Sequence, residues 1–220
     1  MRASDICFTR VICSFGLAIH VLAPLSGMAD SGELAKLKSA QEMASKRKAM
    51  SVDFDQSFYS AASKVTRKSK GNLDYLAPNS FRWEVASPRK EVYVNSPKEF
   101  WSYQEATRHA QKLAPGSFDM DFVDLALHFL SLEKKYKVSG SKEIEVGPNE
   151  FCVELIPLTD GPQKKILLAL SEKTASVTQM NIFYVNGNTT KINFKNPSFL
   201  PKPESRFDFV PPKGTAIDKN

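Results

Sequence analysis

The stretch Phe81-Arg82-Trp83-Glu84 places two large aromatic residues at alternate positions, and Phe207-Asp208-Phe209-Val210 repeats the pattern near the C-terminus. Successive side chains of a β-strand point to opposite faces, so each stretch predicts a strand with both aromatic rings on one face. Large apolar side chains gathered on one face of a sheet need a cover. That cover is either more protein or an apolar ligand.

Other segments alternate in the same way from residue 51 onward. Turn residues separate them, and Ser96-Pro97-Lys98 and Asn186-Gly187 are typical of hairpins. Closely spaced strands with short turns predict an antiparallel sheet. Residues 108–116 show no clear period, which favours an exposed loop. With the segment around Phe207, the expected strands number about eleven: 51–58, 72–75, 81–85, 91–95, 99–103, 136–138, 151–158, 165–170, 176–184, 189–194 and 207–209.

Two segments have helical spacing instead. A narrow stripe of small apolar residues predicts a short amphipathic helix over residues 33–48. A broader apolar stripe predicts a second helix over residues 119–132, which we expect to cover the concave face of the sheet. The stripe of the second helix contains Phe122, Leu125, Ala126, Phe129 and Leu130.

The N-terminal residues 1–29 have the layout of a cleaved secretory signal. Arg2 and Arg10 precede an apolar run from Val11 to Leu25, and small residues follow at Gly27 and Ala29. The alternative is a membrane anchor, but the run is shorter than the roughly 20 residues that span a bilayer. We therefore expect cleavage after Ala29 and one domain from 30 to 220.

The whole chain carries a formal net charge of +6. Such a charge favours an anionic membrane surface or an acidic partner, whereas nucleic acid is not expected for an exported protein. The basic runs Lys46-Arg47-Lys48 and Arg67-Lys68-Ser69-Lys70 are interpreted as solvated faces. Cys152 is the one cysteine after residue 29, so no internal disulfide is expected, and its alternating context favours burial.

The residues that enzymes commonly use are sparse. After residue 29 the histidines are His109 and His128, and with one cysteine no Cys/His zinc site can be assembled. The sequence contains no Gly-x-Ser-x-Gly motif and no phosphate-binding glycine loop. We therefore predict no catalytic residue, metal or cofactor. A secreted hydrolase that uses two carboxylates stays open as a weaker alternative.

A sheet of this size with a broad-striped helix has two physical outcomes. Side chains can fill the interior completely, or the sheet can curve away from the helix and leave an apolar cavity for a ligand. Composition does not decide between these outcomes.

Several motifs follow one another along the chain: Phe54-x-Gln56, Gly71, Pro78-Asn79-x-Phe81-x-Trp83-Glu84, Trp101-x-Tyr103 and Phe207-x-Phe209-x-Pro211-Pro212-x-Gly214. In order and spacing they resemble the LolA family of periplasmic lipoprotein carriers. The resemblance covers nearly all of residues 30–220. It implies an α+β, mainly β fold: a half-open antiparallel β-barrel of about eleven strands, covered by two or three helices around an apolar cavity.

The resemblance also implies a function and a location. Such a monomeric carrier binds the acyl chains of lipoproteins in the periplasm, receives them from an inner-membrane ABC transporter and delivers them to an outer-membrane acceptor. The alternative of the same fold is a lipid-binding or envelope-sensing module. The residues expected to line the acyl-chain cavity are Phe54, Phe58, Phe81, Trp83, Val85, Trp101, Tyr103, Phe122, Leu125, Phe129 and Leu130.

One position departs from the family pattern. Many family members have an arginine directly before the proline of the Pro-Asn motif, where it can hydrogen-bond toward the covering helix and hold it shut. Ala77 occupies that position here. Arg82 lies between the aromatics Phe81 and Trp83 and is expected to point to the opposite face. Either the helix is held only by apolar contacts, or the protein serves a related but different cargo.

Overall fold

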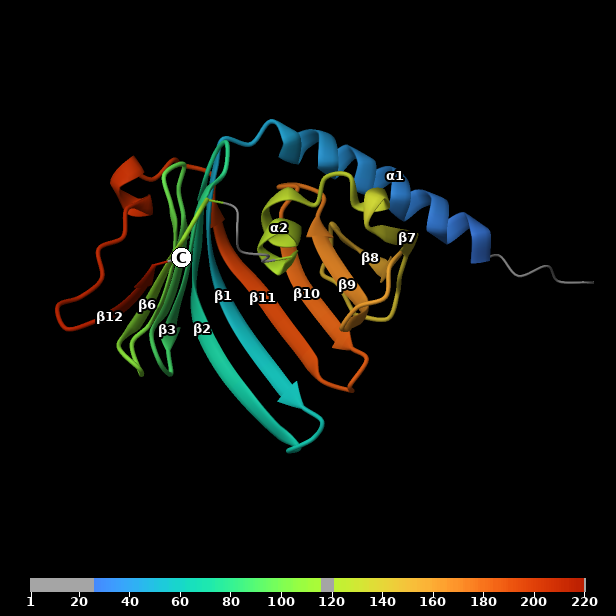
Figure 1. The fold of residues 1–220 in the computed structure, drawn as a ribbon. Helices are drawn as coiled ribbons and strands as arrows, with labels where there is room; N and C mark the ends of the chain where they lie inside the picture. Colours follow the sequence, from blue (N-terminus) through green and yellow to red (C-terminus); the bar gives the residue numbers. More distant parts are fainter. Residues whose placement is uncertain (1–25, 116–120, 220) are drawn as a thin grey trace, which may run out of the picture.

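A single sheet of twelve strands, with two α-helices on its inner side, makes up the computed structural model, which describes residues 26–115 and 121–219. Figure 1 shows the sheet curving around α2 while α1 crosses one end. The elements are α1 (Ser26–Ser45), β1 (Ala49–Ser60), β2 (Val65–Leu76), β3 (Ser80–Ser87), β4 (Glu91–Asn95), β5 (Phe100–Gln104), β6 (His109–Leu113), α2 (Asp121–His128), a 3-10 helix η1 (Leu132–Lys134), β7 (Tyr136–Gly140), β8 (Glu150–Pro157), β9 (Gln163–Ser171), β10 (Val177–Tyr184), β11 (Thr189–Ser198), a 3-10 helix η2 (Glu204–Phe207) and β12 (Ala216–Lys219).

The sheet consists of two antiparallel meanders joined at β1. One meander runs from β1 to β6 and the other from β7 to β11, and β1 pairs with both β2 and β11. The strand order is β12-β6-β5-β4-β3-β2-β1-β11-β10-β9-β8-β7, so the sheet stays open between β12 and β7. The predicted mainly β, half-open antiparallel fold is therefore confirmed. Among the described strands, the one parallel pair is β12 with β6.

Alternation along the strands gives the sheet an inner and an outer face. The inner face carries the main core, in which Phe54, Leu73, Trp83 and Met180 are buried together with residues of both α-helices. α1 packs against β7 and β8, and α2 lies against β10. The amphipathic stripe of α1 contributes Leu37, Ala40 and Ala44 to this core, as its spacing predicts.

The outer face of β4 to β6 carries a second, smaller apolar cluster. Val92, Val94, Trp101, Tyr103 and Ala110 lie there, and Phe207 and Phe209 from the C-terminal segment pack onto them. The C-terminal segment therefore covers the outer face, while the helices cover the inner one.

Gly71 on β2 is a position without room for a side chain. In register it lies opposite Phe54 on β1 and Val85 on β3. A Cβ atom at this position would lie 1.9 Å from the backbone oxygen of Glu84 and 2.6 Å from Cζ of Phe54. The missing side chain is thus what lets the Phe54 ring lie across β2.

Several predictions about the course of the chain were wrong. Residues 108–116 were expected to form a loop, but they contain β6. Phe207 and Phe209 were expected to lie in a strand, but Phe207 ends η2, Phe209 lies in irregular chain, and the last strand is β12. These differences change the predicted eleven strands to twelve.

The predicted helices exist with different bounds. α1 ends at Ser45 instead of Lys48, and α2 ends at His128, after which the chain turns through Ser131, at a φ of 55°, into η1. The predicted start at residue 119 lies outside the described residues. Residues 1–25 of the predicted leader also lie outside them, whereas residues 26–29 already belong to α1. Cleavage after Ala29 stays a prediction.

We expect Gly71→Ala to destabilise the protein by about 3 kcal/mol, since the added methyl group meets backbone that cannot move without breaking strand pairing. The measurement is the free energy of unfolding from denaturant titration. Gly161→Ala is the matched control, because a Cβ there would have no heavy atom within 4 Å. Equal stabilities of the two variants would contradict the close approach at Gly71.

Candidate functional site

Three packed aromatic rings form the centre of the inner face. The rings of Phe54 on β1 and Trp83 on β3 are stacked, with centroids 3.9 Å apart and an interplanar angle of 18°. Phe122 on α2 meets Trp83 edge to face, with centroids 5.0 Å apart and an angle of 78°. Trp83 is 2% exposed and Phe54 is 1% exposed, so an apolar ligand can reach these rings only if the side chains that cover them move.

A rim of half-buried apolar side chains surrounds this centre. Phe81, Val85, Tyr93 and Leu130 pack against the core while keeping part of their surface accessible. Phe81 also meets Phe100, with ring centroids 6.4 Å apart. Half-buried apolar residues beside a buried aromatic centre form the part of the inner face that a ligand would contact first.

Tyr93 is a rim residue that was not predicted from the sequence. It lies directly opposite Trp83 in the β3–β4 pairing, and its hydroxyl donates to Oε2 of Glu91 at 3.3 Å. Burial, together with the negative charge of Glu91, raises the pKa of Tyr93. The short β3–β4 turn sets this register, and counting back from the turn would have placed Tyr93 beside Trp83.

Apolar packing and a hydrogen bond hold α2, which we call the lid (residues 121–128), in place. Val123, Leu125 and Leu127 of the lid are buried in the main core. Just after the lid, the backbone oxygen of Phe129 accepts a hydrogen bond from the Gln41 side chain on α1 at 3.0 Å. α1 therefore anchors the C-terminal end of the lid.

Ala77 does not take part in a polar latch. Its backbone N–H donates to the carbonyl oxygen of Lys48 at 2.8 Å, and its side chain packs against the main core. The nearby Arg47 is engaged elsewhere, donating to the carbonyl oxygens of Thr174 at 2.9 Å and Ala175 at 2.6 Å. Burial lowers the pKa of Arg47, and Tyr75 acts in the opposite direction.

Nine of the predicted cavity residues lie on the inner face or on the segment that covers it. Trp101 and Tyr103 do not. They belong to the outer cluster, where their rings lie 5.8 Å and 5.7 Å from that of Phe209. The reason is register: Phe100 pairs with Asn95 and faces inward, so its neighbour Trp101 faces outward. The nine are Phe54, Phe58, Phe81, Trp83, Val85, Phe122, Leu125, Phe129 and Leu130.

Phe58 differs from the other inner-face residues. By alternation it shares a face with Phe54, and it pairs with Thr190 on β11 and Arg67 on β2. It is half-buried near the far end of β1, outside the main core. Phe58 therefore lies at the margin of the site.

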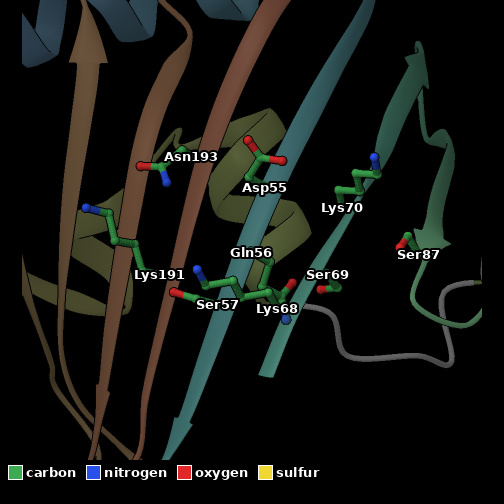
Figure 2. A pocket seen from close by; sticks show the side chains of 9 residues that line it. All are labelled: Asp55, Gln56, Ser57, Lys68, Ser69, Lys70, Ser87, Lys191 and Asn193. Atoms are coloured by element: carbon green, nitrogen blue, oxygen red, sulfur yellow. The ribbon is translucent and has the colours of Figure 1, made fainter. Parts of the chain in front are cut away.

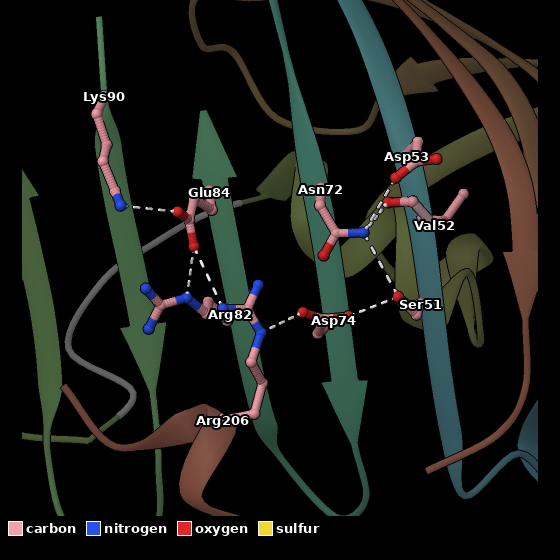
Figure 3. Close-up of polar contacts among 9 residues, drawn as sticks. All are labelled: Ser51, Val52, Asp53, Asn72, Asp74, Arg82, Glu84, Lys90 and Arg206. Carbon is pink, nitrogen blue, oxygen red and sulfur yellow. Dashed lines mark hydrogen bonds and ion pairs between the residues drawn. The ribbon is translucent and has the colours of Figure 1, made fainter. Parts of the chain in front are cut away.

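A polar network on the outer face fixes the C-terminal segment to the sheet (Figure 3). The Asp74 side chain, 2% exposed, accepts from the Ser51 hydroxyl at 2.6 Å and from Nε of Arg206 at 2.7 Å. Arg206 also reaches Oε2 of Glu84 at 3.4 Å. Because Arg206 lies in η2, this network anchors the segment that carries Phe207.

Glu84 is a carboxylate surrounded by cations. Nε of Arg82 lies 2.8 Å from its Oε2, and Nζ of Lys90 lies 3.1 Å from its Oε1. Burial by itself would raise the pKa of Glu84, but the hydrogen bonds from Arg82 and Lys90 outweigh it, and the pKa lies below its ordinary value. Asp74 and Glu84 share Arg206, so these two acids are paired with cations and do not face one another across a cleft, as a hydrolase would require.

The middle of the outer face holds a hydrophilic groove of about 520 Å³. Figure 2 shows Lys68, Lys70, Asp55 and Lys191 around it, with the lid behind the sheet. A hydrogen bond and ion pair with Lys195 lower the pKa of Asp55. This polar lining is unsuited to an alkyl chain.

Metal binding and cysteine chemistry find no support in the described parts of the chain. No group of three His, Cys, Asp or Glu residues there could hold a metal ion. Cys152 is buried, as predicted, and burial raises the pKa of its thiol to about 12, so the thiol is not a nucleophile at neutral pH. Among the same residues, no helix combines the length and the apolarity needed to cross a bilayer.

The fold and the site define a class of protein: a half-open β-sheet whose aromatic inner face is covered by a short helix and whose outer face is covered by its own C-terminal segment. The model of the family described as outer membrane lipoprotein carrier protein LolA matches residues 45–210. The chain therefore belongs to the LolA family.

Curated relatives carry the same description. An outer-membrane lipoprotein carrier protein of Chromobacterium violaceum is 28% identical over 210 residues, covering 91% of this chain and 94% of the relative. The carrier protein of Aliivibrio salmonicida is 22% identical over 202 residues, covering 92% of this chain and 96% of the relative. Both relatives match across nearly their whole length.

Two solved structures share the fold. An uncharacterized conserved protein from Thermus thermophilus aligns with a TM-score of 0.57 at 11% identity, covering 86% of this chain and 99% of that one. MucB aligns with a TM-score of 0.51 at 10% identity, covering 82% of this chain and 63% of that one. At these identities the likeness concerns the fold alone.

We expect Glu84→Gln to lower the free energy of unfolding by about 1–2 kcal/mol at neutral pH, because Arg82, Lys90 and Arg206 lose a charged partner. Since the folded pKa lies below the ordinary 4.5, the stabilisation by Glu84 is complete above pH 4.5 and is lost as the pH falls through the folded pKa. The difference between wild type and variant should therefore shrink in acid. Denaturant titrations across pH measure it, with the exposed Glu105→Gln as control. A difference that stays constant with pH would contradict this account.

Proposed function

We propose that this protein is a periplasmic carrier that binds the acyl chains of outer-membrane lipoproteins against its inner face. Membership of the LolA family supports this function. The observation that carries the proposal is the packing of Phe54, Trp83 and Phe122, in which two rings come from the sheet and the third from the lid. A chain that inserts between them would replace one apolar contact by another.

We also propose which partners the carrier has and that it catalyses no reaction. An inner-membrane ABC transporter would supply the lipoprotein and an outer-membrane acceptor would receive it, with the carrier acting as a monomer and making or breaking no covalent bond. Each buried methylene contributes roughly 0.8 kcal/mol, so acyl chains need such a cover to cross water. Names of relatives as outer-membrane lipoprotein carriers support this cargo.

Purification from the native cell envelope, followed by mass spectrometry of bound molecules, tests the proposal. Co-purified acylated protein would support the carrier. Free lipid without acylated protein would instead indicate the lipid-binding or sensing module of the same fold. If neither is bound, the packed inner face is a core and the proposal fails.

We expect Phe81→Glu to weaken binding of an acylated lipoprotein at least about tenfold, since it puts a charge on the rim of the apolar site. Phe209→Glu is the matched control, because Phe209 is also a partly buried aromatic but belongs to the outer cluster. Binding is measured by co-purification with a labelled lipoprotein, and stability by thermal unfolding. Equal loss of binding and stability in both variants would mark Phe81 as a plain core residue.

Gln41→Ala should accelerate cargo uptake several-fold. It removes the hydrogen bond to Phe129, and a bond of about 1 kcal/mol shifts the lid toward opening by roughly fivefold. Gln179→Ala is the control, since Gln179 makes a similar bond to Asn181 on β10. Stopped-flow binding of a fluorescent acyl peptide measures the rate. An unchanged rate would show that the lid does not limit entry.

A further inference from the structure

An apolar, basic surface lies at the end of the sheet where α1 stops and β11 ends. We define it as the α1–β11 patch, and it includes exposed apolar residues whose exposed fractions are 46% for Met43, 41% for Phe199 and 77% for Leu200. Met43 and Phe199 come from separate segments but line one hollow of about 460 Å³, and Leu200 directly follows Phe199 in the chain. The basic members of the patch are Lys46, Lys48 and Lys173.

Arg47 makes the base of this patch rigid. Its guanidinium is held by the carbonyl oxygens of Thr174 and Ala175 and lies 5.0 Å from the ring centroid of Phe199. Arg47 thus contacts one face of the Phe199 ring, while part of the ring stays exposed to solvent. A fixed aromatic residue with the more exposed Leu200 beside it presents apolar surface outward.

The lysines of the patch lack acidic partners among the described residues. In the parts of the chain that the structure describes, no carboxylate forms an ion pair with Lys46, Lys48 or Lys173. Glu172, next to Lys173 in the chain, forms its ion pair with Lys36 instead, with Nζ and Oε1 2.7 Å apart. The patch therefore combines exposed apolar side chains with an excess of positive charge.

We infer that the α1–β11 patch docks onto the surface of an anionic phospholipid bilayer. Charge complementarity calls for an anionic partner, and the exposed apolar residues call for one into which they can insert. Protein interfaces are depleted in lysine and favour Tyr, Trp and Arg, whereas lysines with flexible stems around protruding apolar residues suit lipid headgroups. An acidic protein surface is thus the less fitting partner.

The patch is separate from the apolar site, because Met43, Phe199 and Leu200 are absent from the core around Trp83. The inference therefore goes beyond the proposed function and would hold equally for a lipid-binding module. Loss of membrane docking and loss of cargo binding can be measured independently.

The test is flotation of the protein, purified from the cell envelope, with two kinds of vesicle. One contains phosphatidylethanolamine and phosphatidylglycerol, and the other contains only phosphatidylcholine. Wild type should float with the anionic vesicles, less at high salt, and little with the neutral ones. Absence of flotation with anionic vesicles, or equal flotation with both, would overturn the inference.

Two patch variants and two controls locate the contact. The charge variant Lys46→Glu/Lys48→Glu/Lys173→Glu should lose at least about tenfold in partitioning, since each lysine near an anionic surface contributes severalfold. The apolar variant Phe199→Ser/Leu200→Ser should also lose about tenfold. The controls change exposed residues elsewhere by the same chemistry: Lys137→Glu/Lys142→Glu/Lys164→Glu and Val185→Ser/Val210→Ser.

All variants keep the same N-terminus, so any contribution of the N-terminus to vesicle binding is the same in each of them. Arg47 is left unchanged, and thermal unfolding confirms that each variant folds. If the patch variants float as well as the controls, the docking surface is not the α1–β11 patch. Cargo binding should be the same in all four variants.

Discussion

The contact between the Phe54 ring and Trp83, made across Gly71, is the interaction on which the rest of the structure depends. It joins β1, β2 and β3 on one face, because Phe54 crosses the strand between its own and that of Trp83. A side chain at Gly71 would collide with the Glu84 backbone before it met the ring. Phe122 then packs edge-on against Trp83, so the lid is positioned by the same pair of rings.

A sheet whose concave side is apolar still has a convex side to cover. Here the outer face of β4 and β5 carries Val92, Trp101 and Tyr103, which would otherwise be exposed to water. The C-terminal segment covers them with Phe207 and is fixed by the ion pair of Arg206 with the buried Asp74. This cover is anchored by charge, whereas the lid on the inner face is held mainly by apolar contacts. The two covers therefore differ in how easily they can move.

The strands that the sequence reveals are those that carry large side chains on one face. β3, with Phe81 and Trp83, is the clearest, and most of the sheet follows from the same alternation. β6 has no such pattern, because its buried outer-face residue is the small Ala110. It is a strand because β5 and β12 pair with it, and pairing is not visible in a local pattern.

The face of the sheet to which a side chain points is harder to predict than the presence of the strand. β5 contains aromatics at three positions, Phe100, Trp101 and Tyr103, so alternation allows either face to be the inner one. The length of the β4–β5 hairpin decides, since it pairs Asn95 with Phe100. For a similar reason, the sequence could not show that Phe207 and Phe209 cover the outer face instead of lying in a strand. A segment that covers a sheet has the same composition as a strand within it. The inner pair Phe81 and Trp83 could be predicted because no competing aromatic lies next to either.

Under the proposed function, the energy needed to move the lid is similar to the energy that a bound acyl chain would supply. Burial of Val123, Leu125 and Leu127 contributes roughly 1.5–3 kcal/mol each, on the order of 5–9 kcal/mol in all. About ten methylenes of an acyl chain contribute roughly 8 kcal/mol at about 0.8 each. Under the proposed function, exchange of the lid for the chain is therefore nearly balanced in free energy, as passive uptake and release of the cargo would require. A charged side chain at position 77 that hydrogen-bonded to the lid would shift the equilibrium toward the closed form. The single hydrogen bond from Gln41 to Phe129 changes the free-energy difference between the open and closed forms only slightly.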